Sequence, residues 1–380
     1  MDAVDKAILN RLQYDFPLTT TPFSTIACRL GLSPREVIGR IVRLKHKNII
    51  RQIGAIFDSS KIGYHSVLAA FKVPRERINE VAQRLNANPA VTHNYARNGR
   101  YTLWFTVTVP RNRELSKEVA EMASCARVSD WLFLPTIKNF KVSFQLDMGM
   151  GDQKRTQSTR ASDKPPPKRP PLPLAINKFF VRELQKDLRV TIRPYRPAAQ
   201  RLGLTEGQIT AEMQRYLQAG AIRRIAAVLK PVQAGYPANI LTVWKTPPEK
   251  TAILGQAAAR RKQVSHCYER PQRPGWPYSV YMMIHGRSTA DCRKVIHAIA
   301  ADSGITHYRE LPTVKEYKKD RVDYFPHIHP CHNSKGSCGE RVRLPESSVQ
   351  DVVAVHVGMK DISPMNNGHR RGRPSGVAET

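Results

Sequence analysis

The chain has 380 residues, of which 41% are hydrophobic, and its formal net charge is +30 at pH 7. This length suffices for two ordinary domains and a tail, and no apolar run approaches the ~20 residues of a membrane-spanning helix. The six cysteines are scattered without a C-x-x-C pair, so neither a disulfide framework nor a zinc ribbon is supported. The start MDAVDKAIL has no signal-peptide pattern, and we expect a cytoplasmic protein. The charge predicts a polyanionic partner, either a nucleic acid or a small molecule with many carboxylates.

Residues 1–60 are predicted to form a winged helix-turn-helix. Three segments have apolar residues at helical spacing: AVDKAILNRLQ, FSTIACRLG and EVIGRIVRLKHKN. The second is expected to end at Gly31, and the third to begin after Ser33 as its N-cap, with Glu36 in its first turn. The stretch RQIGAIFD that follows is expected to be the wing strand.

Residues 61–148 are predicted to form a ferredoxin-like βαββαβ domain. The expected strands are SVLAAFKV, AVTHNYA, YTLWFTVTV and VSDWLFLPTIK. The expected helices are RERINEVAQRLNA and RELSKEVAEMASC, which separate the strands in βαββαβ order.

The same order of elements recurs later in the chain. Short segments of the first half match segments of the second: RLGLS (29–33) with RLGLT (201–205), VTHNY (91–95) with VSHCY (264–268), and LPTIKNFK (134–141) with LPTVKEYK (311–318). Several landmarks matched in one order indicate two tandem copies of one α+β fold.

Composition marks the remaining boundaries. Residues 149–173 are polar and Pro-rich, which predicts a linker. Copy 2 is then predicted to hold its winged helix-turn-helix at 174–232 and its ferredoxin-like domain at 233–325. Residues 326–380 show no amphipathic period and are expected to be a disordered tail.

A helix-turn-helix joined to a βαββαβ domain resembles the Lrp/AsnC family of transcriptional regulators. The combination of D-F-P-L…P-F, I-I-R-x-I-G-A-x-F-D, V-T-H-N-Y-x-R, W-F-T and L-P-T-x-K-x-F-K is more specific. Together these motifs resemble the sirohaem decarboxylase family, which reuses the Lrp/AsnC fold, and the likeness covers roughly 1–148 and 172–325. In that family two homologous subunits usually pair. The resemblance therefore implies an internal pseudo-dimer here, with sirohaem and other haem-pathway decarboxylase subunits as expected partners.

The resemblance implies loss of CO2 from the C12 and C18 acetate side chains of sirohaem, in haem d1 or alternative haem b biosynthesis. The conjugated macrocycle takes up the electrons, so we expect no cofactor besides the substrate, which carries its own iron. The carbon left behind needs a proton from a donor whose pKa lies near neutrality. His93 and His266 are the candidate acids, or anchors of the reacting carboxylate.

Tyr95 and Tyr268 stand two residues beyond the histidines, so on a strand they point to the same face and are further catalytic candidates. Asn94 and Cys267 would then face the other way. Sirohaem also carries eight carboxylates, and burying them requires positive charge, for which the arginine fork is well suited. The candidate carboxylate ligands are Arg51, Arg97, Arg223, Arg224, Arg270, Lys138 and Lys315.

Two other functions stay open: a DNA-binding regulator, and a tetrapyrrole-binding protein without turnover. The fold and the charge suit DNA. However, the third helix of copy 2, TEGQITAEMQRYLQAG, has no basic cluster to match Arg35, Arg40, Arg43 and Lys45 of copy 1. A tandem regulator is expected to keep two competent reading helices, so DNA is not the partner we favour.

No metal site is predicted. His46 and His65 are further candidates for iron ligation, although copy 2 has no histidine at the matching positions. HIHPCHNSKGSC and RRGRP, both in the predicted tail, resemble a metal site and an AT-hook core respectively, but the first has no common zinc spacing and the second is a single match.

Overall fold

The computed structural model describes residues 1–142, 145–146, 148 and 175–326. The predicted linker at 149–173, and the predicted tail apart from Pro326, lie outside these residues. In the described part of the chain, no helix combines the length and the apolar character needed to cross a membrane.

The predicted helices of the first domain are confirmed as α1 (Ala3–Tyr14), α2 (Pro22–Leu30) and α3 (Pro34–His46). Gly31 ends α2 with a φ of 66°, a left-handed conformation that glycine adopts at little cost. The Ser33 hydroxyl accepts a 3.1 Å hydrogen bond from the Glu36 backbone N–H and caps α3, as predicted. Copy 2 repeats the motif with α6 (Lys178–Leu184), α7 (Arg196–Leu202) and α8 (Glu206–Gln218).

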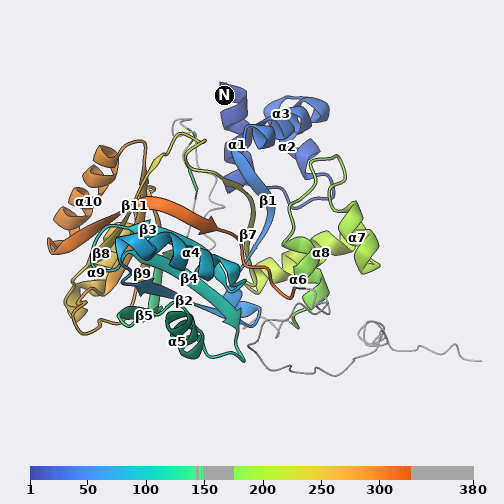
Figure 1. Ribbon diagram of the computed structural model, residues 1–380. Coiled ribbons are helices and arrows are strands. Elements are labelled where there is room, and N and C mark those ends of the chain that lie inside the picture. Colours follow the sequence, from blue (N-terminus) through green and yellow to red (C-terminus); the bar gives the residue numbers. More distant parts are fainter. Residues whose placement is uncertain (143–144, 147, 149–174, 327–380) are drawn as a thin grey trace, which may run out of the picture. The chain divides into compact units, whose positions relative to one another are not determined.

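Strands β1 (Ile50–Phe57) and β7 (Ile222–Leu229), which follow the helices, pair with each other in an antiparallel two-stranded sheet (Figure 1). We expected each to be the wing of its own copy, whereas the structure shows that they join the copies. Ile53 of β1 and Leu229 of β7 pack in one core with the helices of copy 1. The two strands therefore satisfy each other's backbone groups and bury apolar side chains from both copies.

The predicted βαββαβ order is found in both copies. In copy 1 it comprises β2 (Tyr64–Phe71), α4 (Ile78–Ala87), β3 (Val91–Arg97), β4 (Leu103–Pro110), α5 (Leu115–Cys125), β5 (Trp131–Pro135) and an added β6 (Lys138–Val142). In copy 2 it comprises β8 (Ala238–Trp244), α9 (Thr251–Ala259), β9 (Val264–Glu269), β10 (Val280–Gly286), α10 (Thr289–Ser303) and β11 (Tyr308–Lys319). Short 3-10 helices lie at Ser59–Lys61, Arg75–Arg77 and Pro248–Lys250.

One nine-stranded sheet contains both copies, in the order β5-β2-β4-β3-β11-β8-β10-β9-β6. The last strand of each copy crosses into the sheet of the other. The first half of β11 pairs with β8 of its own copy, and its second half pairs with β3. In copy 1, β5 pairs with β2 and β6 pairs with β9. Only Thr136 and Ile137 separate β5 from β6, so the strands at the two ends of the sheet are consecutive in the chain.

The sheet has a different core on each side. On the outer side, one core lies beneath α4 and α5, and another beneath α9 and α10. Between the two copies lies a third core, which includes Trp104, Leu134, Tyr281 and Leu311. Trp276, from the longer loop of copy 2, is 2% exposed and fills part of this inner core. That loop therefore fills part of the space between the copies, whereas the shorter matching loop of copy 1 has no tryptophan.

Candidate functional site

The repeated pentapeptides lie on β3 and β9, at matched places in the two copies. The rings of His93 and Tyr95 have centroids 6.3 Å apart, and those of His266 and Tyr268 are stacked at 5.9 Å. All four side chains are half-buried. Each histidine therefore shares a face with its tyrosine, and both pairs remain accessible to a ligand.

The residues between each pair face the helices, as predicted. Asn94 donates a 3.2 Å hydrogen bond to the Ala82 carbonyl of α4. Cys267 is fully buried in the core beneath α9 and α10. Both histidines therefore point away from the helices and toward the other copy.

A hydroxyl residue precedes each histidine at a β-bulge. The register of β3 on β4, and of β9 on β10, shifts immediately before the histidine. The bulge leaves Thr92 and Ser265 outside the regular ladder. The Thr92 hydroxyl lies 3.0 Å from Nδ1 of His93, and the Ser265 hydroxyl lies 2.9 Å from Nδ1 of His266. Each imidazole is thus held through Nδ1, which leaves Nε2 for a ligand.

Cationic side chains from both copies gather near the histidines. Lys319 lies opposite His93 in the pairing of β11 with β3. Arg51 of β1 donates a hydrogen bond to the Lys319 carbonyl and lies 3.7 Å from the Asp320 carboxylate. The positive charges of Lys319 and Arg51 both lower the pKa of His93.

The copy 2 histidine has its own cations. Arg223 of β7 lies 3.1 Å from the Asp58 carboxylate, and Arg224 is the next residue. Charges on His93, Arg223, Arg224 and Lys319 all lower the pKa of His266. Because His93 and Lys319 act on the histidine of copy 2, the two histidines share one cationic site where the copies meet.

Loss of surrounding water is the main cause of the low pKa values of three histidines. It lowers the pKa of His93 to about 4, and those of His266 and His285 to about 3, with the nearby cations adding to the effect. Our expectation was a proton donor with a pKa near neutrality. The difference has a physical reason: burial and the neighbouring cations both disfavour the imidazolium forms.

We expect this burial to make the protein less stable in acid. The unfolded chain binds protons on these histidines below a pH of about 6.5, whereas the folded chain does not until pH 4 to 3. Each histidine should therefore cost up to about 1.4 kcal/mol of stability per pH unit below ~6.5. When urea unfolding is measured at pH 7 and at pH 5, the free energy of unfolding should fall by about 2 kcal/mol less for His285→Gln than for wild type. His297→Gln, at an exposed position of α10, is the control; equal losses in all three proteins would contradict the prediction.

Arg97 and Arg270 join the two copies. Arg97 is 3% exposed, and its Nη1 donates to the Leu311 carbonyl at 2.7 Å and to the Thr313 hydroxyl at 2.9 Å. Arg270 makes the reciprocal bonds, to the Leu134 carbonyl and the Thr136 hydroxyl. Each arginine therefore binds the L-P-T motif of the other copy. Within the described part of the chain, the Nε atoms of both are buried without a partner, so a role in carboxylate binding stays a prediction.

The predicted lysine ligands lie elsewhere. Lys138 is exposed, with its Nζ 5.2 Å from the centre of the Phe140 ring. Lys315 is exposed, with its Nζ 4.6 Å from the Tyr317 ring centre and 3.3 Å from the Asn79 amide oxygen of α4. The structure does not bring either lysine to the histidines.

The two candidate iron ligands are also outside the shared site. His65 is half-buried on β2 and bonded through Nε2 to the Arg113 carbonyl at 2.8 Å, and His46 is exposed at the end of α3. Among the described residues, no three His, Cys, Asp or Glu side chains gather as a metal site.

Sequence reasoning missed Thr92, Ser265, His285 and Lys319. The first two carried a signal, because both pentapeptides have a hydroxyl residue just before the histidine. His285 and Lys319 carried none, because copy 1 has Thr108 and Val142 at the matching positions. A search for shared residues cannot find a residue that belongs to one copy alone.

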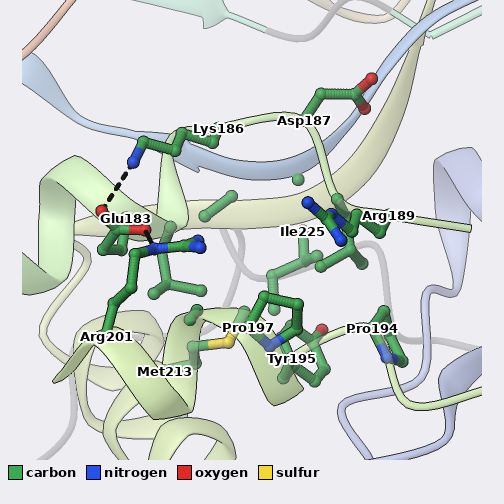
Figure 2. Close-up of a pocket in the computed structure, with 15 residues that line it drawn as sticks. Glu183, Lys186, Asp187, Arg189, Pro194, Tyr195, Pro197, Arg201, Met213 and Ile225 are labelled. Carbon is green, nitrogen blue, oxygen red and sulfur yellow. Dashed lines mark hydrogen bonds and ion pairs between the residues drawn. The ribbon is translucent and has the colours of Figure 1, made fainter. Parts of the chain in front are cut away.

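A separate cavity of about 310 Å³ lies between β1, β7 and the helices of copy 2 (Figure 2). Glu183 lies at 2.6 Å from both Lys186 and Arg201 at its side, so these charges are already paired. None of the predicted site residues lines this cavity. It is therefore distinct from the shared histidine site.

Family comparisons agree with the duplicated architecture. The AsnC-like ligand binding domain matches residues 61–141 and 233–318. The siroheme decarboxylase NirDL-like HTH domain matches residues 5–51 and 177–223. The protein is thus a tandem member of the AsnC-like class, with a helix-turn-helix and a ligand-binding domain in each copy.

Whole-chain relatives narrow this class. A siroheme decarboxylase from Hydrogenobacter thermophilus is 34% identical over 319 residues, which cover 84% of this chain and 94% of the relative. The chain belongs to the siroheme decarboxylase family, and the predicted enzyme class, carboxy-lyase, is confirmed. A crystal structure of the siroheme decarboxylase NirDL with an iron-uroporphyrin III analogue matches with a TM-score of 0.64 and 30% identity, covering 86% of this chain and 95% of that chain.

The alpha and beta subunits of siroheme decarboxylase from Desulfovibrio desulfuricans are 40% and 36% identical to this chain. They match 39% and 38% of it, and 86% and 92% of their own lengths. Each is therefore about the size of one copy, in agreement with the fused pseudo-dimer.

Proposed function

We propose that this protein is a sirohaem decarboxylase that removes CO2 from the C12 and C18 acetate side chains to give 12,18-didecarboxysirohaem, for haem d1 or alternative haem b biosynthesis. The observation that carries the proposal is the matched placement of His93 and His266, one from each copy. Each shares a strand face with a tyrosine and has Nδ1 beside a bulge hydroxyl, and charges from His93 and Lys319 reach His266. Two matched histidines facing one substrate correspond to two matched decarboxylations.

The cations suit a substrate with eight carboxylates. Five cationic side chains act on one another or on the histidines there: Arg51, Arg223, Arg224, Lys319 and Arg321. Loss of water lowers the pKa of Arg321 to about 10, which still leaves it charged at neutral pH. Asp320 lies 3.7 Å from Arg51, Asp58 lies 3.1 Å from Arg223, and Glu316 lies 3.8 Å from Lys319. The substrate carboxylates would share or displace these partners and neutralise the positive charge that remains.

Each decarboxylation breaks the bond between the acetate CH2 and its carboxylate carbon. CO2 leaves, the electron pair enters the conjugated macrocycle, and the carbon takes one proton to become a methyl group. His93 or His266 supplies this proton from Nε2, because Nδ1 faces the bulge hydroxyl. The macrocycle is the electron sink, so no separate cofactor is required.

Substrate binding would itself prepare the acid. A carboxylate placed beside a histidine raises its pKa, because the opposite charge favours the imidazolium form. The low pKa values of His93 and His266 therefore mean that protonation would accompany the arrival of the anionic substrate. This restricts proton delivery to the occupied site.

Anaerobic incubation of the purified protein with sirohaem, followed by mass spectrometry, tests the proposal. We expect the tetrapyrrole to lose the mass of two CO2. A folded protein that binds sirohaem without any change in its mass would instead be a carrier, and the proposal would fail.

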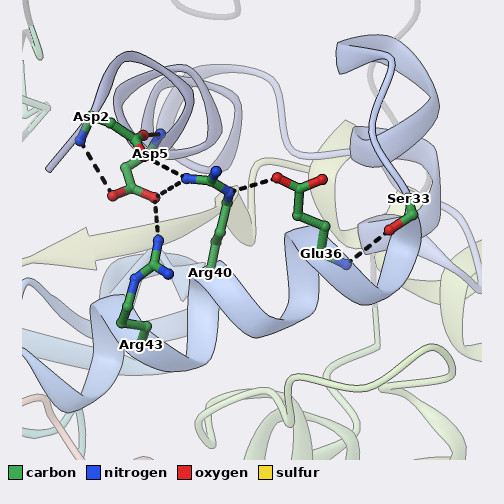
Figure 3. A network of polar contacts seen from close by, with 6 residues as sticks. All are labelled: Asp2, Asp5, Ser33, Glu36, Arg40 and Arg43. Carbon is green, nitrogen blue, oxygen red and sulfur yellow. Dashed lines mark hydrogen bonds and ion pairs between the residues drawn. The ribbon is translucent and has the colours of Figure 1, made fainter.

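The reading helix of copy 1 argues against a DNA-binding regulator (Figure 3). Arg40 Nη1 lies 2.8 Å from Asp2 and 3.0 Å from Asp5, and its Nε lies 2.9 Å from Glu36. Arg43 Nη2 lies 3.1 Å from Asp5. These two arginines of the basic cluster are therefore already paired with carboxylates of α1, its N-cap residue and α3.

Two further cations of the reading helices are also paired. Lys45 Nζ lies 2.5 Å from Asp187, and Arg215 of α8 lies 2.7 Å from Glu212. Binding DNA would require breaking these pairs, so the phosphate contacts that dominate DNA affinity are weakened.

The double variant Asp2→Asn/Asp5→Asn should bind duplex DNA several-fold more tightly than wild type, because it releases Arg40 and Arg43. A gel-shift titration at low and physiological salt measures this, and the gain should be lost at the higher salt. Glu118→Gln, which releases Arg113 outside the helix-turn-helix, is the control. Sequence-preferring binding by wild type at physiological salt would favour the regulator.

A further inference from the structure

His285 extends the contact behind His266. It lies on β10 and is 9% exposed, and its Nε2 lies 3.1 Å from the Ser265 hydroxyl. The same hydroxyl lies 2.9 Å from Nδ1 of His266. Three side chains therefore form one chain of hydrogen bonds, from the strand interior to the face of the shared site.

The matching chain of hydrogen bonds in copy 1 is one residue shorter. Thr92 contacts Nδ1 of His93 as Ser265 contacts His266, but Thr108 occupies the position of His285. The Thr108 hydroxyl pairs with the Ser66 hydroxyl at 2.9 Å. No second imidazole therefore stands behind His93 among the residues that the structure describes.

The opposite asymmetry occurs on the neighbouring strands. Lys319 pairs in register with His93, whereas Val142 pairs with His266. His93 thus has an ammonium beside it on the strand, and His266 has an isopropyl group. His93 therefore lies beside a positive charge, whereas His266 lies at the end of a chain of hydrogen bonds.

The chain determines which nitrogen of His266 carries the proton. The Ser265 hydroxyl has one proton to donate, and Nδ1 of His266 at 2.9 Å is a nearer acceptor than the Met283 carbonyl at 3.3 Å. When Nε2–H of His285 donates to the Ser265 oxygen, the hydroxyl proton is directed to Nδ1 of His266. His266 then carries its own proton on Nε2, which faces the site.

We propose, on the basis of the decarboxylase function proposed above, that His285 is a positioning residue that fixes the Nε2–H tautomer of His266 through Ser265. This makes His266 the proton donor of the pair, while His93 beside Lys319 holds the substrate carboxylate. The neutral imidazole is not itself the acid: when substrate binding adds a proton at Nδ1, the Ser265 hydroxyl turns to the Met283 carbonyl and its oxygen accepts from Nδ1–H. The imidazolium then gives its Nε2 proton to the substrate carbon and returns to the neutral form.

The charges around His285 are consistent with this role. Loss of water, and then the charges of His266, Lys319 and Arg97, lower its pKa. It is therefore neutral near pH 7, with one donating and one accepting nitrogen, and can orient Ser265 without adding charge.

Two variants of His285 test the proposal. His285→Phe removes the donor, whereas His285→Gln retains an amide N–H near the position of Nε2. Thr108→Val, at the matching place in copy 1, is the control. The first readout is the 15N chemical shifts of His266 in the free protein, assigned with His266→Asn; the second is the rate of CO2 release and the sirohaem dissociation constant across pH 6 to 8.

We expect wild type and His285→Gln to show the Nε2–H tautomer, and His285→Phe to show a mixture. His285→Phe should release CO2 about tenfold or more slowly with an unchanged dissociation constant, and its pH profile should shift. Unchanged His266 shifts in His285→Phe would overturn the proposal. If that variant fails to fold, Ser265→Ala breaks the same chain and carries the same expectation. The tautomer is measured without substrate, so this result stands apart from a failure of the decarboxylase assay.

Discussion

Replacing His266 with alanine is expected to lower the rate of CO2 release by at least about 100-fold, the usual contribution of a positioned general acid. Replacing His93 with alanine should lower the rate as well, because His93 holds the reacting carboxylate in place. The dissociation constant for sirohaem should change less than about threefold, because cations such as Arg51 and Arg223 supply most of the attraction. Single-turnover reactions under anaerobic conditions, with binding measured separately, distinguish the two effects.

The products formed by the His93→Ala and His266→Ala variants show how the two histidines divide the two decarboxylations. If each histidine serves one acetate, each variant should accumulate a species that has lost one CO2, and the two species should differ in the ring affected. If His266 donates both protons, His266→Ala should stall before the first loss. His65→Ala is the matched control, because His65 is half-buried on β2, is bonded to the Arg113 carbonyl and lies outside the shared site. Near-normal rates in both His93→Ala and His266→Ala would exclude histidine as the acid.

Local patterns predicted the helices and their caps well. Gly31 and Ser33 end and begin helices where their residue types predict, because these effects depend on a few neighbouring residues. The duplication was also readable, since matched landmarks preserve order. The crossing of the last strands was not: VSDWLFLPTIK was predicted as one strand of one sheet. Its partner strands lie far away in sequence, and β5 and β6 belong to different neighbours.

The physical reason for the crossing lies in the L-P-T motif. Pro135 and Pro312 have no N–H to donate to a ladder, so the strand can leave its first partner there. The carbonyl of the preceding residue, Leu134 or Leu311, then accepts from an arginine of the other copy. The motif was noted in the sequence as a repeat landmark and the arginines as substrate ligands. Their mutual contact required the three-dimensional pairing of the copies.

Some of the site residues could be predicted from local sequence patterns, and others could not. Alternation along a strand placed each tyrosine with its histidine, and this needed no knowledge of the fold. Lys138 and Lys315 were chosen because they match between copies, yet both lie on exposed faces beside aromatic rings. A residue that is the same in both copies can be retained for packing as readily as for function. Conversely, Lys319 and His285 reach the shared site without a matching partner in copy 1.

Arg97→Met and Arg270→Met are each expected to destabilise the protein by about 2–4 kcal/mol. Methionine removes a buried charge, which by itself is favourable, but it leaves a strand carbonyl and a threonine hydroxyl without their donor where the ladder is interrupted. Arg270 also lies 5.7 Å from the Tyr281 ring centre, so its loss should be the larger of the two. Urea unfolding followed by both fluorescence and circular dichroism measures the change.

The reciprocal arrangement makes a sharper prediction for the double variant Arg97→Met/Arg270→Met. Both arginines bridge the copies, so their joint loss should weaken coupling between the halves and separate one unfolding transition into two. Amide exchange should quicken in β6 and in the second half of β11, which pair with the other copy. Thr313→Val removes one acceptor and keeps the arginine bonded to the Leu311 carbonyl, so it should cost about 1 kcal/mol and leave a single transition. A double variant that unfolds in one transition with wild-type exchange in β6 and β11 would show that these hydrogen bonds do not couple the unfolding of the two copies.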